Sequence, residues 1–172
     1  MTTQFFMGQS YNLSDESFTE SSGFGDDKSS LITEAALKSG PLSLNQKARF
    51  SDDGGTLLRS QSNVSLDFSK FNLGLSHSFY EKGQTSSANN RNSDLKEATG
   101  RLRWQISRHW RLDASARENL ETEERVRADA AFTYEDECTL IAIQIDRDYA
   151  RVGGIKPDTS INFTFTLKTI GN

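Results

Sequence analysis

The chain has 172 residues, of which 34% are hydrophobic, and its formal net charge is −4, from 20 Lys and Arg against 24 Asp and Glu. No window approaches the run of about 18 apolar residues that a membrane-spanning helix needs, which excludes an α-helical membrane protein. The acidic balance also weighs against nucleic-acid binding, because proteins that bind nucleic acids usually present a basic surface.

Apolar and polar residues alternate with a period of two along most of the chain, which predicts β-strands with one apolar face. In chain order, strands are expected over residues 4–13, 31–38, 42–50, 58–68, 71–79, 98–106, 110–116, 126–134, 141–145 and 161–167. Leaving out the first strand, the apolar faces hold 41 residues and no Asp, Glu, Lys or Arg, whereas 17 of the 41 intervening residues are charged. Because helices do not sort charge by odd and even positions, the chain is predicted to be all-β.

The connections between these strands alternate in length. Short turns are expected at 39–41, 69–70, 107–109 and 135–137, whereas the other connections, at 14–28, 51–55, 81–93, 118–124 and 148–158, are mostly longer. Short turns at one end and longer loops at the other are typical of outer-membrane barrels. The sequence therefore predicts an antiparallel up-and-down meander of about ten strands, part of an outer-membrane β-barrel or a small barrel, with both chain ends on the short-turn side.

A soluble β-sandwich shows the same alternation, so the pattern leaves open whether the apolar face meets another sheet or lipid. Two features favour lipid. The strands reach about the 9–11 residues that a tilted membrane strand needs, where ordinary strands have about 5–6. Aromatic residues also gather near the strand ends, as interfacial girdles do: Phe68, Phe71, Trp104, Trp110 and Tyr134 beside the short turns, and Phe50 and Phe79 at the other end.

The intervening positions carry 11 positive and 6 negative residues, a net charge of +5 that would face a wet barrel interior. Nine of the positive residues form a set that we call the basic face: Lys47, Arg49, Arg59, Arg101, Arg103, Arg111, Arg117, Arg125 and Arg127. The simpler interpretation, which we favour, is that these charges pair with carboxylates across strands and stabilise the hairpins modestly.

Several segments carry a family resemblance through their order and spacing. Gly8-Gln9-Ser10-Tyr11 precedes a loop rich in Gly, Asp and Ser, and the stretch from Ala98 through Trp110-Arg111-Leu112 covers late hairpins. Tyr134-Glu135-Asp136-Glu137-Cys138 forms a tyrosine, acidic and cysteine turn, and Ile155-Lys156-Pro157-Asp158 precedes the last strand, which runs through 163–169. From about residue 5 to its end, the chain resembles the C-terminal barrel part of the lipopolysaccharide-assembly family LptD, also called OstA or organic solvent tolerance protein.

The resemblance implies a component of lipopolysaccharide transport and assembly into the outer leaflet of the outer membrane. In that family a periplasmic jellyroll domain receives lipopolysaccharide, and a plugged barrel releases it through a seam between its first and last strands. The implied partners are lipopolysaccharide, an LptE-like plug lipoprotein, the barrel-assembly machinery and outer-membrane lipid, with no nucleic acid. Both chain ends would be periplasmic. No signal peptide or jellyroll segment is seen in residues 1–172, and ten strands are fewer than half of the family's barrel, so a single barrel segment of a longer protein is expected.

Three sets of residues acquire roles from the resemblance. Cys138, the single cysteine, would form a disulfide with a cysteine outside this chain, and Glu137 stands where many family members have a second cysteine. The basic face would guide the phosphorylated sugar portion of lipopolysaccharide, with Arg101 and Arg103 as the residues to test. The terminal strand, 160–168, would form half of the lateral seam and signal to the assembly machinery through the lipid-facing residues Ile161, Phe163, Phe165 and Leu167.

Catalytic chemistry finds little support in the sequence. His77 lies on an apolar face and His109 in a short turn, without a carboxylate at a spacing that implies a catalytic dyad. Neither a GxSxG motif nor a metal-ligand cluster occurs, so we expect no enzyme, cofactor or metal. The alternatives to the transport component are a self-contained ten-stranded outer-membrane barrel with a structural or adhesive role, a soluble β-sandwich binding module, and an enzyme whose site is assembled from loops.

Overall fold

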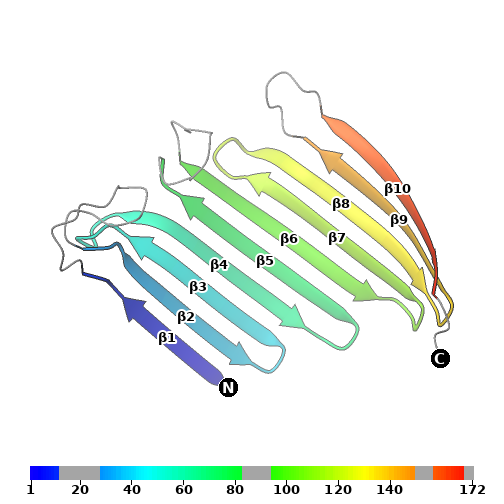
Figure 1. The fold of residues 1–172 in the computed structure, drawn as a ribbon, viewed down its shortest axis with the longest axis horizontal. Coiled ribbons are helices and arrows are strands. Elements are labelled where there is room, and N and C mark those ends of the chain that lie inside the picture. Colours follow the sequence, from blue (N-terminus) through cyan, green and yellow to red (C-terminus); the bar gives the residue numbers. More distant parts are fainter. Residues whose placement is uncertain (12–27, 83–93, 150–156, 169–172) are drawn as a thin grey trace. The chain divides into compact units, whose positions relative to one another are not determined.

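The computed structural model describes residues 1–11, 28–82, 94–149 and 157–168, and every regular element within them is a β-strand (Figure 1). The strands are β1 (Thr2–Gly8), β2 (Leu31–Ser39), β3 (Leu42–Phe50), β4 (Leu57–Asp67), β5 (Phe71–Tyr80), β6 (Leu95–Gln105), β7 (Trp110–Asn119), β8 (Glu124–Glu135), β9 (Thr139–Asp148) and β10 (Asp158–Leu167). The predicted all-β meander of ten strands is confirmed, and nine strands lie within a few residues of their expected bounds.

The strands are hydrogen-bonded in sequence order from β1 to β10, and the sheet is not closed into a barrel. Strands β1 and β10 are the two ends of this order, and each has one hydrogen-bonded neighbour. The chain divides into two compact units, which we call unit 1 (Met1–Val64 and Ser76–Glu97) and unit 2 (Ser65–Leu75 and Ala98–Asn172). Strands β4, β5 and β6 contribute residues to both units.

In unit 1 the register of β2 and β3 places apolar residues opposite apolar residues and a carboxylate opposite a cation. Leu37 lies opposite Leu44 on the apolar face, and Glu34 lies opposite Lys47 on the polar face. The short turn between the two strands contains Gly40 at φ 55°, a left-handed conformation that glycine adopts without the clash a Cβ would cause. This turn fixes the pairing and therefore decides which side chains share a face.

The first strand differs from its prediction, because it spans Thr2–Gly8 and not residues 4–13. After Gly8 the chain leaves the β1–β2 ladder. The Gln9 side-chain amide then donates hydrogen bonds to the backbone oxygens of Ser29 (2.9 Å) and Asp52 (2.8 Å). Tyr11 forms only an isolated bridge with Lys28, and residues 12 and 13 lie outside the described part of the chain. Side-chain hydrogen bonds to other segments therefore replace the ladder that the alternation predicted.

In unit 2 the strands β7 to β10 carry the alternation across three successive pairings. Trp110 lies opposite Tyr134, Phe132 opposite Ile143, and Ile143 opposite Phe163, all on the apolar face. The Trp110 ring stacks on Phe132 with 4.7 Å between ring centroids. Directly opposite residues of an antiparallel pair share a face, so the predicted assignment of faces is confirmed for these strands.

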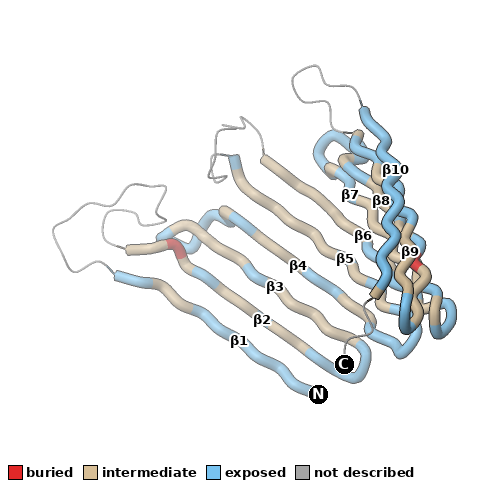
Figure 2. Tube along the Cα trace, turned by 45° about the vertical axis from the view of Figure 1, so that its right-hand side comes forward, coloured by how far each residue is buried: buried red, intermediate tan, exposed pale blue. Residues whose placement is uncertain are grey.

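No hydrophobic residue is buried among the described residues, and the two buried positions are polar, Ser30 and Thr133 (Figure 2). Large apolar side chains are instead exposed in both units. In unit 1 they include Phe5, Met7 and Val64, and in unit 2 Phe68, Phe71, Leu73, Leu75, Trp104, Trp110, Phe132, Ile143 and Ile145. Nothing within the described chain covers the apolar face of either unit.

The described segments contain no helix of the length and apolarity that crossing a membrane demands. Most of the expected long connections at 14–28, 81–93 and 148–158 fall outside the described residues. The same holds for residues 155, 156 and 169–172, on which part of the family resemblance depends.

Candidate functional site

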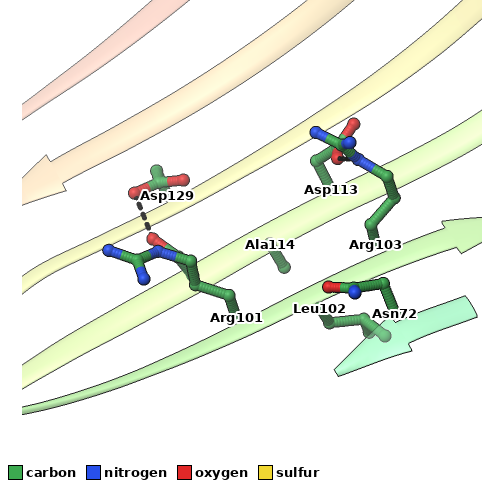
Figure 3. A pocket seen from close by; sticks show the side chains of 8 residues that line it. Asn72, Arg101, Leu102, Arg103, Asp113, Ala114 and Asp129 are labelled. Carbon is green, nitrogen blue, oxygen red and sulfur yellow. Dashed lines mark hydrogen bonds and ion pairs between the residues drawn. The ribbon is translucent and has the colours of Figure 1, made fainter. Parts of the chain in front are cut away.

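The polar face of unit 2 brings together several members of the basic face. Strands β6, β7 and β8 and the start of β5 surround a shallow hollow of about 310 Å³ (Figure 3). It is lined by Asn72, Arg101, Leu102, Arg103, Asp113, Ala114, Ser115 and Asp129. Arg101 and Arg103, the two residues singled out for phosphate contact, therefore do line one hollow.

A single carboxylate holds two of the arginines in this region. The Nε of Arg103 lies 2.6 Å from Oδ1 of Asp113, and the Nε of Arg111 lies 2.7 Å from Oδ2. Figure 3 shows Arg103 extending across to Asp113 on the neighbouring strand. Charge-assisted hydrogen bonds of this length are the strong ones, so Asp113 both fixes the guanidinium groups and offsets their charge.

The charges on β7, β8 and β9 are paired in the same way. Arg127 contacts Asp146 at 3.0 Å and Asp129 at 4.0 Å, while Arg125 contacts Glu118 at 3.4 Å. One member of the basic face in unit 2 differs from these, because Arg101 has no ion pair within the described residues. Arg117 lies directly opposite Arg127 on the same face. Most basic residues of unit 2 are therefore neutralised locally, in agreement with the simpler interpretation of the charge pattern.

The polar face of unit 1 holds the remaining members of the basic face around a second hollow, of about 330 Å³. Its lining residues are Ile32, Lys47, Ala48, Arg49, Arg59 and Gln61. The Nζ of Lys47 lies 3.1 Å from Oε1 of Glu34, and this pair is largely exposed. Arg49 and Arg59 form no ion pair within the described residues, so the cationic character of the basic face is least offset here.

Two further observations describe the arginines of unit 1. The Nε of Arg49 is buried and has no hydrogen-bond partner among the described residues. The guanidinium carbon of Arg59 lies 4.8 Å from the centroid of the Tyr80 ring, and the Gln61 amide donates a hydrogen bond of 3.1 Å to the Tyr80 hydroxyl. Stacking on an aromatic ring uses the face of a guanidinium group and leaves its N–H edges available for an anion.

The turn between β8 and β9 is tightly organised around Asp136. Its carboxylate accepts hydrogen bonds from the backbone N–H of Cys138 (2.9 Å), the hydroxyl of Tyr134 (2.8 Å) and the backbone N–H of Thr139 (2.7 Å). These bonds favour the ionised form and lower the pKa of Asp136 below its ordinary value. The Cys138 thiol is exposed and free in this chain, at the end of the turn directly before β9, so a partner in another segment can reach it.

The terminal strand is attached to this turn at one end and exposed along its length. The Nζ of Lys168 contacts Oε1 of Glu135 at 2.7 Å and donates to the backbone oxygen of Asp136 at 2.8 Å. The predicted lipid-facing residues of β10 are all strongly exposed: Ile161 (70%), Phe163 (67%), Phe165 (55%) and Leu167 (69%).

Asp113 and Tyr80 help to organise these two hollows, but they are not among the site residues expected from the sequence. Their positions relative to the predicted short turns would have revealed them. Arg103 and Asp113 lie at equal distances on either side of Arg108, the middle of a predicted short turn. Arg59 and Tyr80 are placed in the same way about the turn at 69–70. Because a short turn sets the register of its hairpin, counting outward from each turn would have predicted both contacts.

Within the described residues, no group of three or more His, Cys, Asp or Glu side chains is arranged to hold a metal ion. No protein-family model matches the chain, and no curated protein matches it significantly.

Proposed function

We propose that this chain is a transmembrane barrel segment of an outer-membrane protein that transports lipopolysaccharide. One observation carries the membrane part of the proposal. The described residues include no buried hydrophobic side chain, yet most of the exposed large apolar residues lie on one face, while ion pairs, together with a few apolar residues such as Phe6 and Ile32, occupy the other. Soluble monomers rarely expose apolar patches of more than a few hundred Å², whereas a barrel strand needs lipid on one side and water on the other.

The open strand order favours a segment over a self-contained barrel. The unpaired backbone groups of an edge strand cost several kcal/mol each in hydrocarbon, so membrane sheets must close. Strands β1 and β10 each have one neighbour in the strand order. We therefore propose that further strands of a longer protein complete the barrel. In this arrangement β10 contributes to the lateral seam and to recognition by the barrel-assembly machinery.

The transported lipid is proposed from the polar face together with the family resemblance. Lipopolysaccharide carries phosphate groups on sugars, and arginine binds phosphate through paired N–H bonds. The polar face presents Arg101 in unit 2 and Arg49 and Arg59 in unit 1 without ion-pair partners in the described residues. An LptE-like lipoprotein inside the completed barrel would contact the same face.

Cys138 has a proposed role in the periplasm, which is oxidising. Its exposure at the end of the β8–β9 turn supports a disulfide with a cysteine of a periplasmic domain of the longer protein. Cys138→Ser should change the mobility of that protein on a non-reducing gel. Unchanged mobility would show that the thiol has no such partner.

The transport proposal is tested by depleting the protein in its native cells and labelling newly made lipopolysaccharide at the cell surface. Depletion should reduce surface labelling, and membrane fractionation should place the protein in the outer membrane. Complementation with Arg101→Glu and Arg103→Glu together should restore less transport than complementation with Arg108→Glu, a matched charge reversal in the β6–β7 turn. A chain that is monodisperse in water without detergent would contradict the membrane location and favour the soluble β-sandwich.

A further inference from the structure

We propose that the hollow over β2, β3 and β4 in unit 1 is a binding site for a phosphate-class anion, held by Arg49, Arg59 and Lys47. The site is distinct from the Arg101–Arg103 hollow of unit 2. It depends on the geometry of unit 1 alone and does not require that the chain transport lipopolysaccharide.

The strongest indication is the unsatisfied guanidinium nitrogen of Arg49. A buried N–H without a partner has lost its hydrogen bonds to water and gained none in return, which is unfavourable. The Nε of Arg49 is in this condition beside a hollow of about 330 Å³. An anion in the hollow would accept this hydrogen bond and offset the cost.

A second arginine is held ready from the adjacent strand. Arg59 stacks on Tyr80, and the hydroxyl of Tyr80 is in turn held by the amide of Gln61, which itself lines the hollow. This chain of contacts fixes the plane of the guanidinium group without using its N–H edges. A preorganised guanidinium loses less conformational entropy when an anion binds.

The charge balance selects an anion with more than one negative charge. Three cationic side chains line the hollow. One carboxylate, that of Glu34, lies beside the hollow through its ion pair with Lys47. This leaves an excess of two positive charges. A phosphate monoester carries close to two negative charges and three acceptor oxygens at neutral pH, which matches two guanidinium groups and an ammonium group.

The test uses the protein as purified from its native cells in a neutral detergent, with isothermal titration calorimetry at low salt. Three probes present the same chemistry on different carriers: inorganic phosphate, glucosamine 1-phosphate, and phosphatidic acid added to the micelles. Glucosamine without phosphate is the control ligand. In parallel, an NMR spectrum of the protein with ¹⁵N-labelled arginine side chains follows the Nε–H signals. The signal that is absent from the spectrum of Arg49→Gln is assigned to Arg49, and it should be the one that shifts on binding.

Saturable binding of the phosphate probes, and not of glucosamine, is expected. Arg49→Gln and Arg59→Gln should each weaken binding about tenfold, the effect of losing one charge-assisted hydrogen bond. Glu34→Gln should tighten binding, because it removes the competing carboxylate, and an increase in affinity cannot arise from misfolding. Arg108→Gln, an equal loss of charge in the β6–β7 turn, should leave the affinity unchanged.

The relative affinities also identify the carrier of the phosphate. Tightest binding of glucosamine 1-phosphate would make a phosphorylated sugar the ligand, tightest binding of phosphatidic acid a lipid headgroup, and equal binding a free phosphate. The proposal is overturned if no phosphate probe binds saturably, or if Arg49→Gln, Arg59→Gln and Glu34→Gln all bind like the parent chain. Either result leaves the transport proposal intact, since that proposal is tested in cells.

Discussion

The polar faces of the two units carry similar residues, but their arginines differ in whether they form ion pairs with carboxylates. In unit 2, Asp113 holds Arg103 and Arg111, and Arg127 is paired with Asp146. In unit 1, Arg49 has a buried nitrogen without a partner and Arg59 rests on an aromatic ring. Both faces carry more cations than carboxylates, yet most arginines of unit 2 are paired with a carboxylate, whereas Arg49 and Arg59 of unit 1 have no ion pair within the described residues.

The difference shows that an arginine on a polar face can either stabilise the sheet or remain available to an anion. Its contacts with neighbouring side chains distinguish the two cases. An arginine bound to a carboxylate contributes to the stability of the sheet and has little remaining attraction for an anion. An arginine stacked on an aromatic ring keeps its N–H edges available to a ligand, and an arginine with a buried, unsatisfied N–H costs stability until a ligand accepts that hydrogen bond. The net charge of the face, which is basic throughout, does not separate the two cases.

The largest expected effect is the loss of the shared carboxylate of unit 2. Asp113→Ala should lower the free energy of unfolding by about 2 kcal/mol, because two charge-assisted hydrogen bonds disappear and two guanidinium groups are left close together. Glu34→Ala in unit 1 should cost only about 0.5 kcal/mol, since the Glu34–Lys47 pair is largely exposed. Urea unfolding in detergent measures both. Equal losses would remove the distinction between the units.

Replacing a single arginine in each unit should change stability in opposite directions. Arg49→Met removes an unsatisfied buried N–H and should raise the free energy of unfolding by about 1 kcal/mol. Arg103→Met breaks the contact with Asp113 and should lower it by a similar amount, about 1 kcal/mol. The same urea titration applies, with Arg108→Met as the exposed control. A clear loss of stability in Arg49→Met would mean that Arg49 has a structural role.

The turns provide a smaller contrast between the units. Gly40 in unit 1 and Glu123 in unit 2 both have φ 55°, where a residue with a Cβ is strained. Gly40→Ala should lower the unfolding free energy by about 1 kcal/mol, and Glu123→Gly should raise it by about 0.5 kcal/mol. Gly100→Ala, where an added Cβ meets no atom within 4 Å, is the control and should have little effect. Thermal unfolding of the parent chain and the three variants measures these differences in stability.

Acidification should loosen one turn in each unit. Hydrogen bonds from Ser51 and the backbone N–H of Gly55 lower the pKa of Asp53, and those from Cys138, Tyr134 and Thr139 lower the pKa of Asp136. In the unfolded chain an Asp has a pKa of about 3.9. The folded values are lower, so the stabilisation is present above about pH 4 and is lost as the pH falls through the folded values.

Amide hydrogen-exchange protection at Gly55 and Thr139, corrected for the intrinsic rate, measures this loosening. Protection should fall below about pH 4 in the parent chain. In Asp136→Asn, protection at Thr139 should already be low at neutral pH and should not depend on pH. Protection that stays constant down to pH 2 would show that the ionised carboxylates do not hold the turns.

Strand number, face assignment and the positions of the short turns follow from the sequence, because alternation and turn chemistry are local properties. Ile161, Phe163 and Phe165 lie opposite Ile145, Ile143 and Ile141 of β9, which agrees with their expected place on the apolar face. The predicted end of β1 was wrong because the observed end depends on hydrogen bonds from Gln9 to the distant residues Ser29 and Asp52. Those partners lie 20 and 43 residues away, which a local pattern does not register.

The sequence by itself determined that this protein forms ten strands with an uncharged face and a charged face, since a period of two sorts side chains before any tertiary contact forms. The tertiary structure decided which cations are neutralised and which are left for a ligand. That outcome depends on hairpin register and side-chain reach, which bring Arg103 to Asp113 and leave Arg49 without a partner. It also decided that the apolar face has no cover within the described chain, and the membrane proposal depends on that result.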